Sequence, residues 1–246
     1  MKLKYLIYTL RSINLLVIVI KLNGFDMTEN TKPKNQGDNH QRSSKGRGRP
    51  KCFDEQQALE KAMLLFWQNG YEATSISDLT QTLGITAPSL YSSFGGKAEL
   101  FNQCLDYYLK NEACSMDQIF EQAQTTKIAI EIYLFENLKR LIQINKPTGC
   151  MLVVSTMNCS DQNRDIQNEL LKKRLNAKNK IYSRLLKGQQ SGEIPENTDI
   201  QTMSDFYVTL LQGMTIQARD GATLEQLEQV VKMAMRTWEQ FVEPTK

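Results

Sequence analysis

Residues 75–94 have the sequence S-I-S-D-L-T-Q-T-L-G-I-T-A-P-S-L-Y-S-S-F, which predicts two short helices joined by a tight turn. Ser75 and the aspartate three residues later match an S-x-x-D variant of the capping box, which begins a helix. Gly84 permits the turn. Thr86 then caps the second helix, and Pro88 is tolerated in its first turn, where backbone donors have no helical partner. Two capped helices around a glycine turn are the pattern of a helix-turn-helix unit.

The second predicted helix is polar on one side. It carries three serines and a tyrosine where a core helix would carry more apolar residues, so we expect it to face a polar partner. Its Leu90 and Phe94, together with Leu79 and Leu83 of the first helix, are expected to pack in the core.

Helical patterns surround this unit. Asp54 is placed to cap a helix over 54–69 that Gly70 ends, and another helix begins at G-G-K after Phe94. No alternating strand pattern with hairpin signals follows Lys51, and 41% of the residues are apolar, which is ordinary for a protein with a core. The predicted fold class is all-α. Further helical runs are expected at about 125–144, 150–158, 165–187, 200–219 and 223–241.

Charge is distributed unevenly along the chain. The net charge is +3, but residues 27–51 alone carry +5 and residues 52–246 carry −5. The first of these segments is polar and cannot bury enough apolar surface to fold alone, so we expect a disordered basic arm. Because Arg47, Arg49 and Lys51 stand directly before the helix-turn-helix pattern, we interpret the arm as a contact to DNA phosphates or to a minor groove. A solvated tail is the alternative interpretation.

The first 26 residues permit two interpretations. The apolar run at 15–20 is short, and Arg11 interrupts the apolar residues before it, so the segment lacks the roughly 20 residues that cross a bilayer. It also lacks the long apolar region and small-residue cleavage site of a signal peptide. We prefer to treat it as translated upstream sequence, with the functional start at Met27. The alternative is a membrane-tethered DNA-binding regulator anchored through residues 5–20.

Cysteine and histidine content argues against a metal site or a disulfide framework. The chain has five cysteines without a C-x-x-C pair, and one histidine. We therefore expect reduced thiols, a cytoplasmic protein, and no metal or cofactor. An enzyme is the competing class, but it is not favoured because the sequence has no nucleophile elbow, P-loop or G-x-G-x-x-G motif.

Residues 53–101 resemble the N-terminal DNA-binding domain of the TetR/AcrR family of bacterial transcriptional regulators. The resemblance rests on four motifs that occur in order and at the family's spacing: G-Y-E-A-T-S after the first helix, the T-L-G-I turn, the L-Y-x-x-F helix, and the K-x-E-L-F opening of the next helix. The segment K-P-T-G-C-M-L-V at 146–153 also resembles a stretch found in one branch of the family.

The resemblance implies an all-helical, two-fold symmetric dimer with about nine helices. Its N-terminal three-helix domain would read operator DNA, its C-terminal helices would bind an unknown small-molecule inducer, and its last two helices would form the dimer interface. The implied function is a sequence-specific DNA-binding transcriptional repressor, released from its operator by the inducer or by a reactive species. The expected divisions are an N-terminal extension at 1–51, a DNA-binding domain at 52–112, and an effector-binding and dimerisation domain at 113–246.

Contacts to DNA are expected mainly on the second helix of the unit. Lys97, at the start of the next helix, combines an ammonium group with free backbone N–H groups and suits a phosphate clamp. Ser75, Ser77 and Thr86 are further candidates, although capping is an equal alternative for Ser75 and Thr86. Because the recognition face has no Arg, Asn or Gln, we expect specificity from methyl contacts, water and DNA shape. By resemblance, base or backbone contacts fall on Ala87, Pro88, Ser89, Tyr91, Ser92 and Ser93.

Candidates for an effector pocket are apolar and aromatic residues of the C-terminal half, for which simple core packing is the usual alternative. Cys150 and Cys159 additionally suggest a thiol sensor, in which an oxidant or electrophile modifies a cysteine and DNA is released. An inert core thiol is the alternative for both. The candidate pocket residues are Tyr133, Phe135, Cys150, Met151, Met157 and Tyr182.

Overall fold

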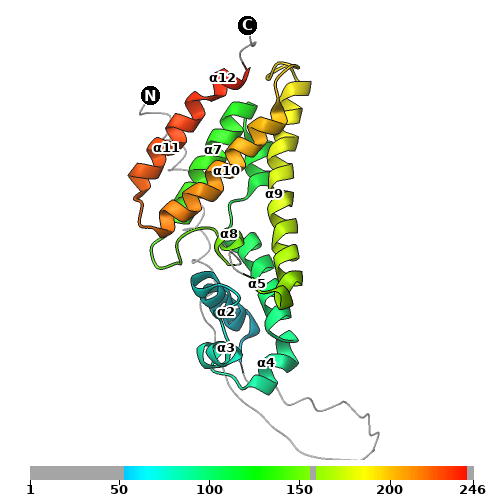
Figure 1. Ribbon diagram of the computed structural model, residues 1–246, viewed down its shortest axis with the longest axis vertical. Helices are drawn as coiled ribbons and strands as arrows, with labels where there is room; N and C mark the ends of the chain where they lie inside the picture. The colour runs from blue at the N-terminus through cyan, green and yellow to red at the C-terminus, as the bar shows by residue number, and fades with distance from the viewer. Residues whose placement is uncertain (1–52, 156–158, 243–246) are drawn as a thin grey trace, which may run out of the picture. The chain divides into compact units, whose positions relative to one another are not determined.

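The structure is a computed structural model that describes residues 53–155 and 159–242, all within one unit of the chain. Its regular secondary structure in these residues is helical (Figure 1). Two helices are short, α8 (Met151–Val154) and α12 (Trp238–Val242), and a 3-10 turn, η1 (Asp161–Asn163), precedes α9. The expectation of an all-α fold with about nine helices is confirmed. The nine helices of seven or more residues are α2 (Glu55–Asn69), α3 (Ile76–Leu83), α4 (Ala87–Phe94), α5 (Lys97–Asn111), α6 (Met116–Gln122), α7 (Thr126–Leu141), α9 (Arg164–Gln190), α10 (Ile200–Arg219) and α11 (Leu224–Arg236).

Helix boundaries differ from the expected ones where local hydrogen bonds or dihedral angles end a helix. α7 ends at Leu141, before residue 144, because the backbone leaves the helical region at Ile142, with φ −126° and ψ 60°. The run expected at 223–241 is divided into α11 and α12, since the Thr237 hydroxyl donates to the Ala234 carbonyl at 2.7 Å and competes for that acceptor. α6 was not expected, because it has only seven residues and no side-chain hydrogen bond caps it.

The helix-turn-helix unit forms as its caps predict. The Ser75 hydroxyl accepts from the Asp78 N–H at 3.1 Å, and the Ser75 N–H donates to the Asp78 carboxylate at 2.8 Å. Gly84 adopts the left-handed conformation, with φ 67° and ψ 31°, which a side chain would strain. Thr86 accepts from the Ser89 N–H at 3.4 Å and begins α4. The predicted turn and both predicted caps are therefore confirmed.

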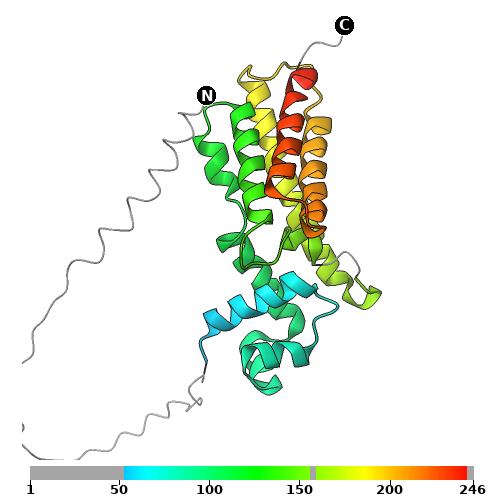
Figure 2. The ribbon, with the colours of Figure 1, turned by 90° about the vertical axis from the view of Figure 1, so that its left-hand side faces the viewer.

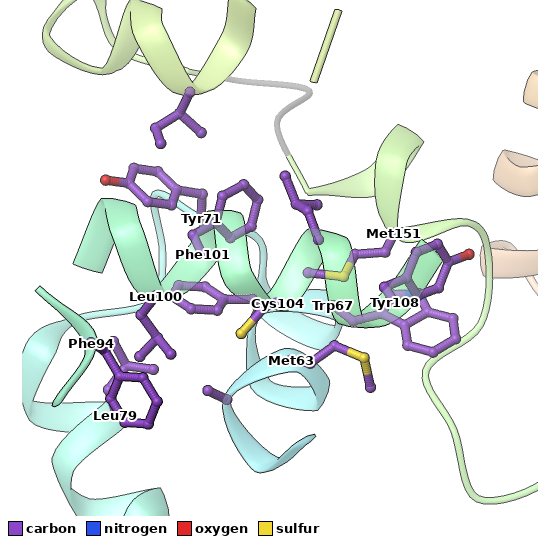
Figure 3. Packing of buried hydrophobic residues seen from close by; sticks show 14 of the residues in the cluster. Met63, Trp67, Tyr71, Leu79, Phe94, Leu100, Phe101, Cys104, Tyr108 and Met151 are labelled. Atoms are coloured by element: carbon purple, nitrogen blue, oxygen red, sulfur yellow. The ribbon is translucent and has the colours of Figure 1, made fainter. Parts of the chain in front are cut away.

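An aromatic core holds α2 against α5 (Figure 3). The ring of Phe101 meets the rings of Phe66 and Tyr71 edge-on, each with a centroid separation of 5.0 Å. Trp67 and Tyr108 form a third edge-on pair, also at 5.0 Å. Each such pair contributes about 0.5–1.5 kcal/mol beyond the apolar area that it buries. We call α2–α5 the N-terminal unit.

The core of the N-terminal unit includes residues that lie far along the chain. Met151 and Leu152 of α8, and Ile166 and Leu170 of α9, belong to the same buried cluster as α2 and α5. Figure 3 shows Met151 beside Trp67 and Tyr108. The core of the N-terminal unit is thus completed by residues of α8 and α9, beyond residue 113.

A second core lies between α7, α9, α10 and α11. In both views α10 and α11 run next to each other, and α9 is the longest helix, with 27 residues (Figures 1 and 2). The buried polar groups among these helices include several hydroxyl groups and the Arg184 guanidinium, which donates to the Thr126 hydroxyl at 2.6 Å. The fully buried side chains of this core include Ile130, Leu134, Leu138, Leu185, Met203, Tyr207 and Val231.

The capping box of α3 generates a prediction about stability. Ser75→Ala removes the acceptor for the Asp78 N–H and is expected to lower the free energy of unfolding by about 1 kcal/mol. Urea denaturation followed by far-UV circular dichroism measures the change. Ser77→Ala is the matched control, because Ser77 is exposed in the first turn of the same helix and does not cap it. Equal stability of the two variants would contradict the role of the cap.

Candidate DNA-binding face and effector cavity

The exposed face of α4 is made by residues at helical spacing. Leu90 and Phe94 point into the core, with 0% and 5% of their surface exposed. Pro88, Tyr91 and Ser92 are exposed, and Tyr91 retains 52% of its surface. Ala87, Ser89 and Ser93 are half-buried and flank this face. Because an α-helix fits the major groove, the exposed hydroxyl groups and Pro88 on this face are placed where a helix can contact base edges.

Three of the predicted contact hydroxyls are engaged within the protein. The Thr86 and Ser89 hydroxyl oxygens lie 3.0 Å apart and form a hydrogen bond. The Ser75 hydroxyl donates to the Asp78 carboxylate at 2.7 Å while it accepts in the capping box. These groups fix the ends of α3 and α4, as the capping interpretation states. Ser77, by contrast, is exposed on α3.

Lys97 is held against the loop that follows α2. Its ammonium group lies 4.2 Å from the centroid of the Tyr71 ring, a cation–π distance. Partial burial lowers the pKa of Lys97, and the nearby Glu72 carboxylate acts in the opposite direction. Lys97 is also the first residue of α5, which has no side-chain cap, so free N–H groups accompany its charge. The phosphate clamp stays a prediction, and the Glu72 carboxylate lies beside the Lys97 ammonium group that would form it.

Glu72 is a functional neighbour that sequence reasoning missed. Its carboxylate accepts from the N–H and the hydroxyl of Ser160, at 2.7 and 2.8 Å, and from the Asn163 side-chain amide at 2.9 Å. These hydrogen bonds, led by that of Asn163, lower the pKa of Glu72 to about 2. Glu72 thus joins the N-terminal unit to the start of α9. Its partners are 88 and 91 residues away in sequence, so no local sequence pattern predicts the contact.

A cavity of about 130 Å³ lies between α5, α7, α8, α9 and α10. Tyr133 and Cys150, two of the predicted pocket residues, line it. Phe135 and Tyr182 instead pack against the second core, and Met151 is fully buried in the core of the N-terminal unit. The cavity is lined by Tyr108, Leu109, Ala113, Cys114, Met116, Tyr133, Asn137, Leu141, Cys150, Leu152, Val153, Arg174, Ala177, Lys178, Ile181, Val208, Leu211, Gln212 and Thr215.

Three thiols have raised pKa values: Cys114 and Cys150, which line the cavity, and Cys159, which lies near the start of α9. Burial raises the pKa of Cys150, whose sulfur lies 3.5 Å from the Tyr108 hydroxyl. Burial also raises the pKa of Cys114 to about 11. Burial, together with the charge of Glu72, raises the pKa of Cys159 near the start of α9. Because the thiolate is the reactive form, raised pKa values leave these groups protonated and weakly nucleophilic at neutral pH.

The segment 149–155 joins the cavity to the N-terminal unit. At one end, the Trp67 indole N–H of α2 donates to the Gly149 carbonyl at 2.9 Å, a buried hydrogen bond. At the other end, the Tyr71 N–H donates to the Ser155 carbonyl at 2.9 Å. Gly149 is required there, because its φ is +86° and a Cβ would lie 3.1 Å from the Thr215 methyl group. Cavity-lining residues of α8 therefore lie between two hydrogen bonds to the end of α2.

Some predicted residues lie outside the part of the chain that the structure describes. These are Arg47, Arg49 and Lys51 of the basic arm, Met157, and residues 5–20 of the considered membrane anchor. Among the helices of residues 53–155 and 159–242, none is both long and apolar enough to cross a membrane. In the same residues, no three Cys, His, Asp or Glu side chains gather closely enough to hold a metal ion.

Two capped helices with an exposed polar face, followed by a helical bundle that contains a partly open cavity, define a helix-turn-helix DNA-binding protein with a candidate effector site. Residues 58–104 match the sequence profile of bacterial regulatory proteins of the tetR family, and residues 133–238 match that of the tetracyclin repressor-like C-terminal domain. The chain belongs to the TetR family of bacterial transcriptional regulators, and the expected family is confirmed.

Relatives support the same assignment along most of the chain. The HTH-type transcriptional repressor ComR of Escherichia coli (strain K12) is 36% identical over 206 residues, which cover 83% of this chain and 98% of ComR. The repressor BdcR of the same organism is 32% identical over 187 residues, covering 76% of this chain and 90% of BdcR. Among solved structures, a cysteine mutant of the TetR family regulator CifR complexed with a 26-bp operator DNA has a TM-score of 0.75 and 31% identity, covering 77% of this chain and 100% of that chain.

Lys97 generates a prediction about DNA affinity. Lys97→Ala is expected to weaken binding to all DNA sequences alike and to lower the salt slope of log K by about one, because a phosphate contact is lost. Fluorescence anisotropy at several salt concentrations measures both quantities. Lys110→Ala is the matched control, since Lys110 is exposed in the last turn of the same helix. A changed preference between sequences with an unaltered salt slope would contradict the clamp.

Proposed function

We propose that the protein is a dimeric repressor that binds a pseudo-palindromic operator and is released by a small molecule bound in the cavity. The relatives ComR and BdcR are named repressors, and the CifR structure contains operator DNA. The observation that carries the proposal is the 149–155 segment, which lines the cavity and is hydrogen-bonded at both ends to the end of α2. A ligand that displaces this segment changes the position of the N-terminal unit.

Operator recognition rests on the exposed face of α4. In a two-fold dimer the two α4 helices enter successive major grooves about 34–36 Å apart on one side of the DNA. Tyr91 and the serines of α4 supply hydroxyl groups, and Pro88 and Ala87 supply apolar contact to thymine methyl groups. Bidentate readout of guanine or adenine is absent from this helix. Lys97 and the residues Arg47, Arg49 and Lys51 supply much of the affinity, and DNA shape supplies part of the specificity.

The operator itself is the direct test of this proposal. Genomic fragments captured by the purified full chain, followed by footprinting, are expected to give a protected pseudo-palindrome whose half-sites lie one helical turn apart. Protection of a single half-site by a monomer, or no sequence-selective protection, would contradict the proposed repressor.

The dimer interface is proposed on the outer faces of α10 and α11. Val230 and Met233 of α11 retain 40% and 59% of their surface exposed, which is high for apolar residues. On α10, the exposed Gly213 has open space around the position of a Cβ, next to the half-buried Leu210. A glycine at such a position lets a partner helix approach closely. The two helices from each subunit then form a four-helix bundle.

Gly213 provides a test of this interface. Gly213→Glu is expected to leave the subunit folded, because nothing lies within 4 Å of the new Cβ, but to prevent dimerisation through bulk and charge. Sedimentation equilibrium measures the oligomeric state, and circular dichroism measures the helix content. Gly213→Ala is the control and is expected to remain dimeric. A Gly213→Glu dimer as stable as the wild type would place the interface elsewhere.

For a ligand in the cavity to release the operator, it must bind more tightly to the conformation of the protein that does not bind DNA. The raised pKa values of Cys150, Cys114 and Cys159 favour reversible, non-covalent binding over modification by a reactive species. The ligand contacts Cys150, Leu152 and Val153, and the hydrogen bonds of the same segment to Trp67 and Tyr71 carry the displacement to α2. α2 then moves with the helices that it packs against, α3 and α5.

The Trp67 hydrogen bond is the part of this route that mutation tests most cleanly. Trp67→Phe keeps an aromatic ring against Tyr108 but removes the donor to the Gly149 carbonyl. We expect an operator affinity about ten-fold weaker, because each of two N-terminal units loses a buried hydrogen bond of about 0.5–1.5 kcal/mol that fixes its position. Fluorescence anisotropy with the footprinted operator measures the operator affinity of this variant.

Trp238→Phe is the matched control for this variant. Trp238 is equally buried, but it belongs to the second core. Its replacement is expected to leave operator affinity unchanged after correction for the folded fraction. If both tryptophan variants bind the operator equally well, the 149–155 segment does not position the N-terminal unit.

A further inference from the structure

The wall of the cavity carries an unbalanced charge. Arg174 and Lys178 of α9 both line it, and none of the lining residues is an aspartate or a glutamate. A cavity whose only ionised side chains are cations favours an anionic occupant, because the desolvated positive charge has no partner of opposite sign within the wall.

The two cations differ in how they are compensated. Lys178 forms an ion pair with Asp205 of α10, outside the cavity wall. Arg174 has no ion pair with a carboxylate among residues 53–155 and 159–242; one of its terminal nitrogens donates to the Leu152 carbonyl of α8 at 2.9 Å. A guanidinium has five N–H donors, and a neutral carbonyl satisfies one. Burial lowers the pKa of Arg174, which is the cost of desolvating this charge. Arg174, which is half-buried, is therefore the cation of the cavity wall without a carboxylate partner among the described residues.

The rest of the wall is mostly apolar, with Asn137, Gln212 and Thr215 among its polar residues, and the space is small. Leu109, Leu141, Ile181 and Val208 come from four different helices and surround the cavity with hydrocarbon. The volume, about 130 Å³, is close to that of a protein cavity of about 150 Å³ that binds benzene. The space thus suits one ring or a short alkyl chain with a single charged group.

We propose that the cavity binds a small apolar monocarboxylate, with the Arg174 guanidinium as the partner of the carboxylate. The fork of the guanidinium matches the two oxygens of a carboxylate, which a lysine ammonium does not. The hydrocarbon part of the ligand fills the space toward α7 and α10. This assignment names the ligand class for the proposed inducer site and therefore rests on the proposed function.

The same contact explains how such a ligand acts on α8. Arg174 holds the Leu152 carbonyl, and Leu152 lies within the 149–155 segment. A carboxylate competes for the guanidinium with charge-assisted hydrogen bonds that are about twice as strong as neutral ones. When Arg174 turns to the ligand, the Leu152 carbonyl loses its donor, and α8 loses one of its attachments to α9.

Isothermal titration with defined probes tests the ligand class. Benzoate and hexanoate are the anionic probes, benzamide is the neutral match for benzoate, and toluene reports on the apolar space alone. We expect the wild-type dimer to bind benzoate at least ten-fold more tightly than benzamide. Saturating benzoate is also expected to release the footprinted operator. Equal affinity for benzoate and benzamide, or no binding of either anionic probe, would overturn the proposal.

Variants of α9 identify the residue responsible. Arg174→Gln is expected to weaken benzoate binding by about ten-fold to a hundred-fold and to leave toluene binding unchanged, which also shows that the cavity is intact. Arg174→Lys keeps the positive charge but loses the two parallel donors of the guanidinium. Its benzoate affinity is expected to lie between those of the wild type and Arg174→Gln. Lys172→Gln, on the exposed side of the same helix, is the control and is expected to bind benzoate like the wild type. Unaltered benzoate affinity of Arg174→Gln would overturn the assignment.

Failure of the ligand class and failure of the proposed function give different results. If toluene binds and releases the operator but benzoate does neither, the proposed repressor function is supported and the proposed carboxylate ligand is contradicted. If benzoate binds through Arg174 but no operator is found, the assignment of the cavity stands and the proposed repressor falls.

Discussion

The hydrogen bond from the Trp67 indole to the Gly149 carbonyl is the contact on which the arrangement of the chain depends. It joins α2, which anchors the helix-turn-helix, to the segment that lines the cavity. The bond needs Gly149, because the positive φ and the adjacent Thr215 exclude a side chain. With the Tyr71–Ser155 backbone bond, it ties both ends of the 149–155 segment to α2 and to the loop that follows α2. We therefore propose that the DNA-binding face and the cavity are parts of one mechanical system.

Much of the N-terminal unit was predictable because its rules are local. Ser75, Gly84 and Thr86 act on neighbours within three or four residues, and the helical period alone sends Leu90 and Phe94 inward. The cavity was predictable only in part. Side chains at helical spacing look alike in sequence whether they face a cavity or a core. The sequence therefore could not separate Tyr133 and Cys150, which line the cavity, from Phe135, Met151 and Tyr182, which do not.

The residues that sequence reasoning missed act through partners far along the chain. In the sequence, Glu72 is an ordinary glutamate. In the fold, its carboxylate accepts hydrogen bonds from Ser160 and Asn163, just before α9. Arg174 looks like one more charge on a long polar helix, because only the fold puts α8 and the cavity beside it. Both sets of contacts exist because α9 packs beside other elements of the fold. Residue spacing and composition do not reveal that packing.

Hydrogen–deuterium exchange with and without operator DNA tests the central claim, that the cavity segment and the DNA-binding face form one system. The N–H groups of Val153, Val154 and Ser155 donate within α8, away from the α4 face, and their exchange reports on that short helix. The account predicts that operator binding slows their exchange together with that of the Tyr71 N–H, since fixing the N-terminal unit fixes the segment bonded to it. Slower exchange confined to α3, α4 and the start of α5, with α8 unchanged, would contradict it.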